Sequence, residues 1–354
     1  YLGLSTGQNF IESLPEDSPG RHAFTVLNEE FNTGAVTTSI VVGASGDDTD
    51  IATAIPLLVA DLIADPAYGE VAVTPSADGE IVLIEAATKL DPSTNEAREA
   101  VATLRSEAIP AAFGDRADAV YVTGMAAGTV DYVEIIDSRM PVIFVFVLGL
   151  SFLLLMIVFR SIVVPLKAIV MNLLSVGAAY GLLVAVFQNG FGADFLGFQQ
   201  TDVIEAWIPL FLFAVLFGLS MDYHIFLLSR IKERYDITGD NDESVAFGLG
   251  STGAIITGAA LIMVAVFGGF AAGDLVMFQQ MGFGLAVAII LDATIVRTVL
   301  VPATMKLLGD RNWYFPRWLE WLPEIHIEGR PDSPVVSTES LAEEAEKERV
   351  LELV

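Results

Sequence analysis

The chain has 354 residues, is 53% hydrophobic with a mean hydropathy of +0.59, and carries 18 basic against 45 acidic side chains. Such apolarity predicts several membrane spans, and the formal charge of −27 argues against nucleic acid as a partner because it repels phosphate. The chain has no cysteine, which excludes a disulfide framework, a thiolate metal site and a cysteine nucleophile.

Residues 1–138 are polar enough to form a water-soluble domain. The elements expected there, in chain order, are a helix (18–31), a strand (35–44), a helix (50–64), two strands around an Asp78-Gly79 turn (71–87), a helix capped by Thr94 (95–109) and a strand (119–123). After the opening helix, this order is that of a split βαβ or ferredoxin-like fold. We therefore predict an α+β ferredoxin-like domain.

Five apolar runs follow, at residues 141–159, 162–187, 206–228, 253–272 and 281–305. Each is near the roughly 20 residues that a bilayer-spanning helix needs. The sequence therefore predicts a five-helix transmembrane domain over residues 139–307. Residues 308–354 are expected to form an acidic tail that is disordered or loosely helical.

Basic residues are distributed unevenly between the links. The links after the first, third and fifth runs carry Arg160, Lys167, Arg230, Lys232, Arg234, Lys306, Arg311 and Arg317, whereas residues 188–205 and 271–280 carry none. Basic links face the cytoplasm, which places the soluble domain outside the cell membrane and the tail inside. An external domain at the N-terminus needs a helix before Tyr1 to carry it across, so we expect a fragment of a longer protein.

The stretch "GLSMDYHIFLLSR" (218–230) places an acid, a phenol and an imidazole inside the third run. Asp222 lies eight residues before Arg230, about 12 Å along a helix, too deep to reach water from the interface. Ionisable residues within spans are costly and mark functional sites. A shielded carboxyl can bind and release protons as access alternates between the two sides. Tyr223 can share a hydrogen bond across a helix interface, and Phe226 stands one turn below Asp222 on the same face.

Other polar residues in the spans have open roles. Asp222 can instead form a structural ion pair with Arg297, while Asp292 and Arg297, five positions apart and about 140° around an α-helix, are expected to need partners on other helices. His224 is either a packed polar residue or a relay. Thr257 and Ser251 either extend a hydrogen-bond path or bond back to their own helix.

These residues carry a family resemblance. The stretch "GLSMDYHIFLLSRIKERYD" resembles the Gly-x-x-x-Asp-Tyr-x-x-Phe-Leu-x-x-Arg signature of the MMPL family of the resistance-nodulation-division (RND) superfamily. The segment "GFGLAVAIILDATIVRTVLVPATMKLLGDRNWYFPRWL" is similar to that family's last membrane helix, and "LPEDSPGRHAFTVLNEEF" to the segment after the first helix of each half. The similarity covers nearly the whole chain to about residue 322.

The resemblance implies one half of a transporter, the C-terminal half, with a porter domain and five of its six helices. It also implies that Asp222 and Tyr223 form half of a proton relay, with Phe226 beside them, and that the missing N-terminal half or a second copy supplies the other Asp-Tyr pair. The expected function is export of lipidic or amphipathic molecules driven by the proton-motive force, with no cofactor and no resident metal.

Three other functions are compatible with parts of the pattern. A protein-translocation helper of the same superfamily shares the domain order, and a lipid sensor without transport shares the membrane domain. Asp222 and Asp292 could form an intramembrane aspartyl protease dyad, but "IILDAT" lacks the Gly-x-Gly-Asp motif of presenilin-like proteases. We therefore predict that the chain is not an enzyme.

Overall fold

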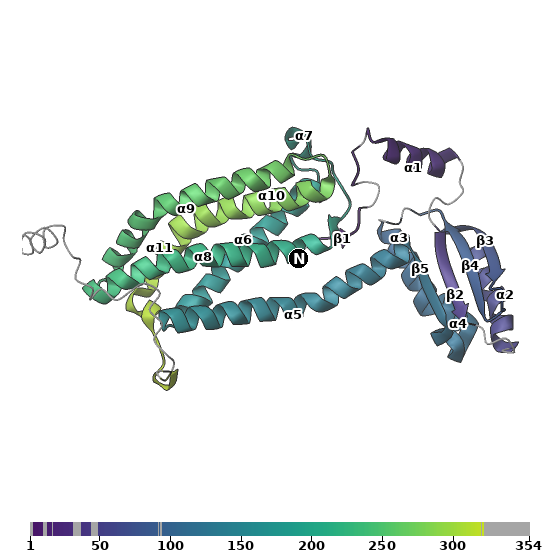
Figure 1. Ribbon diagram of the computed structural model, residues 1–354, viewed down its shortest axis with the longest axis horizontal. Coiled ribbons are helices and arrows are strands. Elements are labelled where there is room, and N and C mark those ends of the chain that lie inside the picture. The colour runs from purple at the N-terminus through teal and green to yellow at the C-terminus, as the bar shows by residue number, and fades with distance from the viewer. Residues whose placement is uncertain are drawn as a thin grey trace, which may run out of the picture.

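The computed structural model describes residues 3–9, 13–15, 17–30, 37–43, 49–90, 92, 94–319 and 321. They form a unit containing a β-sheet and a bundle of long helices (Figure 1). Two separate hydrophobic clusters lie inside, one in each part. Most of the expected acidic tail, from residue 322 on, lies outside the described residues.

The sheet unit contains one antiparallel four-stranded sheet. Its strands β2 (Thr37–Gly43), β3 (Tyr68–Pro75), β4 (Ile81–Thr88) and β5 (Val120–Gly124) lie in the order β3-β4-β2-β5. Helix α2 (Thr49–Ala64) connects β2 to β3, and a helical stretch made of α3 (Asn95–Thr103), a π-helical turn (Leu104–Ala108) and α4 (Ile109–Phe113) leads towards β5. The predicted order of strands and helices is confirmed, and α1 (Pro19–Glu30) precedes them as expected.

Local sequence signals account for these elements. Strand β2 alternates between buried and half-exposed residues, so that Thr38, Ile40 and Val42 point into the core. Thr94 caps α3 as predicted, because its hydroxyl accepts a hydrogen bond of 3.3 Å from the Ala97 N–H. Gly79 adopts a φ of +75° in the turn between β3 and β4, a conformation that favours glycine.

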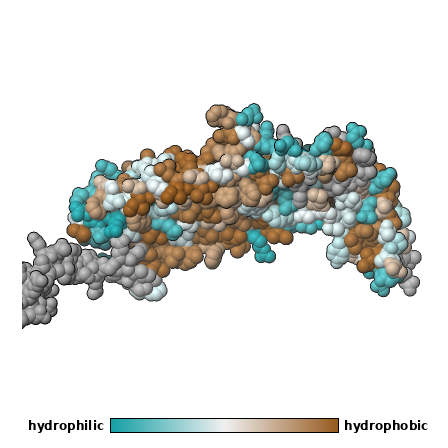
Figure 2. Space-filling view, turned by 45° about the horizontal axis from the view of Figure 1, so that its top comes forward, coloured by the Kyte–Doolittle hydropathy of each residue, from teal (hydrophilic) through white to brown (hydrophobic). Residues whose placement is uncertain are grey.

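The bundle contains five helices that are long and apolar enough to cross a membrane among the described residues, which confirms the predicted number of spans. They are α5 (Met125–Phe159), α6 (Val163–Leu183, extended by a π-helical turn to Gln188), α8 (Trp207–Thr238), α9 (Asn241–Ala271) and the run from α10 (Val276–Leu291) through the π-helix η4 (Asp292–Leu300) into α11 (Val301–Leu308). On the face shown in Figure 2, apolar side chains cover most of the bundle and polar ones gather towards its ends.

Helix α5 joins the two parts without interruption. It runs for 35 residues from the end of β5 to the far end of the bundle (Figure 1). The expected boundary between residues 138 and 139 therefore falls inside a continuous helix. Any movement of the sheet unit relative to the bundle must bend this helix or carry it along.

Close packing of α9 on α10 depends on glycine. A Cβ added at Gly282 would overlap the backbone of Phe267 and Ala271, and one at Gly248 would overlap Ile231 of α8. Gly250 and Gly268 face open space instead. Part of the glycine content of these helices thus serves close helix packing.

A short parallel pairing ties the N-terminal segment to the bundle. Strand β1 (Thr6–Gly7) pairs with β6 (Ile204–Glu205), which immediately precedes α8. Two-residue strands carry no readable period, so the sequence did not predict this pair. It closes the end of the bundle that lies nearer to the sheet unit.

Candidate functional site: a buried charged cluster in the helix bundle

Arg297 and Asp292 form an ion pair in the middle of the bundle. The guanidinium Nη2 and Nε donate to Asp292 Oδ2 at 2.7 and 3.0 Å, and the two side chains are 2% and 10% exposed. Arg297 Nη2 also donates to the Ser220 carbonyl oxygen of α8 at 2.7 Å. The pair therefore links the last span to the third.

This pairing corrects the expectation that Asp292 and Arg297 need partners on other helices. That expectation assumed α-helical geometry, in which positions five apart point in different directions. Both residues belong to η4, a π-helix, whose i→i+5 hydrogen bonds bring residues five apart onto one face. Arg297 does not pair with Asp222 either, because Asp222 lies on the exposed face of α8 whereas Arg297 is buried.

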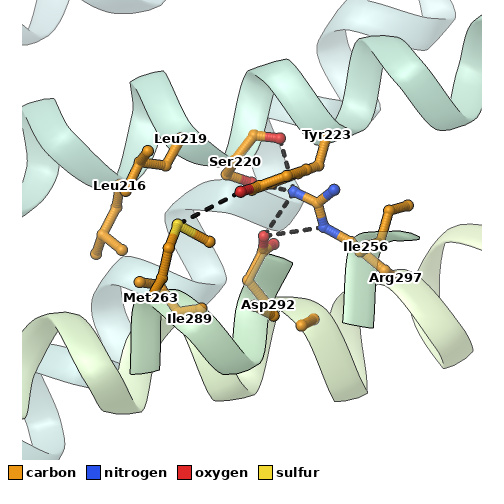
Figure 3. Close-up of a pocket in the computed structure, with 11 residues that line it drawn as sticks. Leu216, Leu219, Ser220, Tyr223, Ile256, Met263, Ile289, Asp292 and Arg297 are labelled. Carbon is orange, nitrogen blue, oxygen red and sulfur yellow. Dashed lines mark hydrogen bonds and ion pairs between the residues drawn. The ribbon is translucent and has the colours of Figure 1, made fainter. Parts of the chain in front are cut away.

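Tyr223 adds an aromatic wall to the cluster. Its ring lies 4.9 Å from the Arg297 guanidinium carbon, a cation–π contact, and its hydroxyl contacts the Met263 sulfur of α9 at 3.4 Å. Figure 3 shows Tyr223, Ser220, Asp292 and Arg297 converging on one pocket. Its other walls are apolar and come from Leu216, Leu219, Ile256, Ala260, Met263, Ile289 and Ala293.

Asp222 does not enter this cluster. It lies on the exposed face of α8, while its neighbour Tyr223 points into the pocket. Thr257 of α9 is exposed as well. Ile231 of α8 lies against Gly248 of α9. Asp222 comes nine residues before Ile231, and Thr257 comes nine residues after Gly248. The two therefore lie at about the same level of the antiparallel α8–α9 pair. Both residues are thus exposed polar groups at about mid-bundle depth.

The remaining predicted residues lie on the same two helices, α8 and α9. Phe226 is half-buried and packs against the bundle core. His224 is completely buried, with 0% exposure. Ser251 bonds back to the Gly248 carbonyl oxygen at 3.1 Å, as one interpretation expected.

Sequence reasoning missed several buried polar residues. Ser220 donates to Asn172 Oδ1 of α6 at 2.7 Å. Lys167, expected in a link, lies within α6, is 9% exposed and donates to Asn312 Oδ1 at 3.3 Å. The only available signal was a polar residue inside an apolar run, which does not reveal which helices meet.

A second polar cluster lies where β1 meets β6. Glu205 is 8% exposed, and its carboxylate accepts a hydrogen bond of 2.9 Å from the Asn9 N–H. Gln280 of α10 accepts from the Glu205 N–H at 3.0 Å and donates to the Thr201 hydroxyl at 3.1 Å. Burial raises the pKa of the Glu205 carboxyl, while the Asn9 hydrogen bond opposes that rise.

No group of three or more histidine, aspartate or glutamate side chains within the described part of the chain is placed to hold a metal ion. The charged cluster is built from one acid, one base, a phenol and hydroxyls. Such a set can hold and pass protons, and it contains no nucleophile activated by an adjacent base.

Comparison with known proteins places these residues in a family. The sequence model of the MMPL family matches residues 14–331. The mycolic acid-containing lipids exporter MmpL11 of Mycolicibacterium smegmatis is 43% identical over 254 residues, 72% of this chain and 26% of that protein. The heme uptake protein MmpL11 of Mycobacterium tuberculosis is 43% identical over 242 residues, 68% of this chain and 25% of that protein.

A third relative, the trehalose monomycolate exporter MmpL3 of Mycobacterium tuberculosis, is 39% identical over 222 residues, 61% of this chain and 23% of that protein. The chain thus spans about a quarter of the length of these relatives. All three carry names of transport proteins and none that of an enzyme, in agreement with the prediction from sequence. The chain belongs to the MMPL family, whose members are membrane transporters.

Proposed function

We propose that this chain is one half of a proton-driven exporter of lipidic or amphipathic molecules in the cell membrane. In this proposal, Asp222 and Tyr223 carry protons together with an equivalent pair from another half of the protein. That half is either an N-terminal half that precedes this chain or a second copy of it. The names of the relatives favour a large amphipathic cargo, since they mention mycolic acid-containing lipids, trehalose monomycolate and heme.

The observation that carries the proposal is the exposure of Asp222 at mid-bundle depth. A charged side chain facing lipid at this depth costs at least about 2.5–3.5 kcal/mol on insertion scales. The helices beside it are apolar enough to lie in a membrane. Asp222 therefore needs a polar cover, and the second half of a transporter supplies one. Asp222 then becomes shielded by the interface between halves.

Tyr223 connects this interface to the buried ion pair. It follows Asp222 directly in sequence, and its ring lies against Arg297. A proton bound at Asp222 changes the charge facing the interface, and the Tyr223 ring links that face to the Arg297–Asp292 pair. Protonation thereby favours one arrangement of α8 and η4 over another, which is the differential stabilisation that transport requires.

The sheet unit fits the role of an external porter domain. Its β-α-β-β-α-β order and the strand order β3-β4-β2-β5 support a ferredoxin-like fold. The basic residues Arg160, Arg230 and Lys306 lie at the opposite end of the bundle, which supports a cytoplasmic location for that end. The sheet unit then lies outside the cell, where it can open and close a path for the cargo.

The test is Asp222→Asn in the intact protein, with export of the cargo lipid as the readout. Asparagine keeps the size of the side chain but cannot bind and release the proton, so export should be lost while membrane insertion stays normal. Asp194→Asn, at an exposed aspartate of the short helix α7 (Ala193–Leu196), is the matched control and should export normally. Retained export in Asp222→Asn would remove the mechanism.

A further inference from the structure

A line of buried polar side chains runs along the contact between α6 and α8. Asn172 and Ser175 lie on α6, and Ser220 and His224 on α8, with exposures of 2%, 6%, 7% and 0%. Residues three or four positions apart share one face of a helix, so each pair points the same way. The Ser220–Asn172 hydrogen bond of 2.7 Å joins the two faces. We call these four residues the polar seam.

Most of the seam's polar atoms lack a protein partner. Within the described residues, Asn172 Nδ2, Ser175 Oγ and both ring nitrogens of His224 are buried and make no hydrogen bond. A buried polar atom that stays unpartnered is destabilising, so native proteins rarely tolerate several together. Buried water, which makes about three hydrogen bonds, commonly satisfies groups of this kind.

The seam is connected at both ends. Towards the middle of the bundle, Arg297 Nη2 lies 3.3 Å from the Ser220 hydroxyl oxygen, and Arg297 Nη1 and Asp292 Oδ1 are also buried without a partner among the described residues. Towards the far end, helix register places His224, four residues after Ser220, at the level of Ala168, four residues before Asn172. Ala168 has a small side chain and adjoins the buried Lys167.

At this end of the seam, Lys167 of α6 is a buried base that is 9% exposed. Lys167 contacts Asn312, which donates in turn to the Met305 carbonyl oxygen at 2.7 Å, near the end of α11. Polar groups thus follow one another from the ion pair to the far end of the bundle.

We propose that the polar seam is a buried water site that connects the Arg297–Asp292 pair with the end of the bundle away from the sheet unit. Water there donates to and accepts from the neutral imidazole of His224, which can do both at once through its two nitrogens. The role of this water rests on the proposed function: it gives protons a path between the relay and the cytoplasm.

The direct test is solid-state NMR of the intact protein in lipid bilayers, with ¹⁵N-labelled histidine. Magnetisation transferred from water should reach the ring nitrogens of His224, whose signals are identified by their loss in His224→Gln. His22, which is exposed on α1, provides the positive reference. No transfer to His224 under conditions in which His22 responds would overturn the proposal, because it would show a dry seam.

A second measurement links the water to proton movement. His224→Phe fills the site with an apolar ring and should abolish proton flux in reconstituted vesicles, whereas Leu174→Phe, on the exposed face of α6, should leave it unchanged. Unchanged flux in a folded His224→Phe protein would contradict the path. A dry His224 together with lost export in Asp222→Asn would reject only the seam, and retained export in Asp222→Asn would reject the proposed function whatever the NMR result.

Discussion

At the scale of single residues, the Arg297–Asp292 pair dominates the interior of the bundle. Removing two charges from water costs several kcal/mol each, and mutual attraction repays this cost only with good geometry. Here Asp292 Oδ2 accepts two hydrogen bonds from Arg297, and the Ser220 carbonyl oxygen accepts a third. The two charges are therefore tolerated together, whereas either charged side chain buried without the other would be destabilising.

We predict that Asp292→Ala lowers the free energy of unfolding of the intact protein by about 3–5 kcal/mol, because it leaves a buried guanidinium unpaired. The double variant Asp292→Leu/Arg297→Met should lose less, since no charge remains buried. Thermal unfolding in detergent measures both. Asp242→Asn, which breaks an exposed pair with Lys306, is the control and should change the free energy by less than about 1 kcal/mol. An Asp292→Ala protein as stable as this control would contradict the prediction.

The sequence identified most of the buried charged and aromatic polar residues of the bundle but not their partners. Asp292, Arg297, Tyr223 and His224 stand out because polar residues are rare in apolar runs. Their pairing could not be predicted, because it depends on a π-helix that no residue pattern announces. Asn172 was missed because a single amide gives no indication of the helix it faces.

At the scale of elements, the β1–β6 pair fastens the N-terminal segment to the bundle. Besides the Asn9–Glu205 hydrogen bond, Arg98 of α3 donates to the Thr6 carbonyl oxygen at 2.6 Å and Thr129 of α5 contacts Gln8 at 3.3 Å. This short segment thus contacts the sheet unit, α5 and the bundle. It is the place where movement of one part can reach the others.

Glu205 makes the stability of this β1–β6 attachment depend on pH. Burial raises its folded-state pKa above the ordinary value of 4.5, so as pH rises past that value the unfolded chain loses the proton first. Stability contributed by Glu205 should therefore be complete below pH 4.5 and decline as pH rises towards the raised pKa. Glu205→Gln, which stays neutral, should lack this decline.

The measurement is the melting temperature of both proteins across that pH range. The wild type should fall relative to Glu205→Gln as pH increases, whereas Glu80→Gln, at an exposed glutamate of the sheet unit, should follow the wild type. A difference that stays constant or reverses its sign with pH would reject this interpretation.

Elements were predictable where the residue pattern is long and regular. The five spans and the strands of the sheet unit follow from apolar length and from alternation, as in β2. Strand β1 and helix α7 are too short for either signal. The sheet-to-bundle junction was also hidden, since α5 continues through the change from polar to apolar residues.

At the scale of the whole molecule, the architecture supports the proposal of half a transporter. An apolar bundle carries an exposed acid at mid-depth on one face, and a 35-residue helix leads from it to the sheet unit. Both α5 and α9 bury few of their residues within the chain. The sequence predicted these parts, whereas the exposure of Asp222 in this chain follows only from the three-dimensional packing of α8.

The central claim is that Asp222 carries protons across the membrane. The most direct measurement is the collapse of an imposed pH gradient in vesicles that contain the intact protein, followed with an internal pH-sensitive dye. We predict that the wild-type protein dissipates the gradient when cargo lipid is present and that Asp222→Asn does not. Equal dissipation by the two proteins, each inserted to the same extent, would contradict the claim.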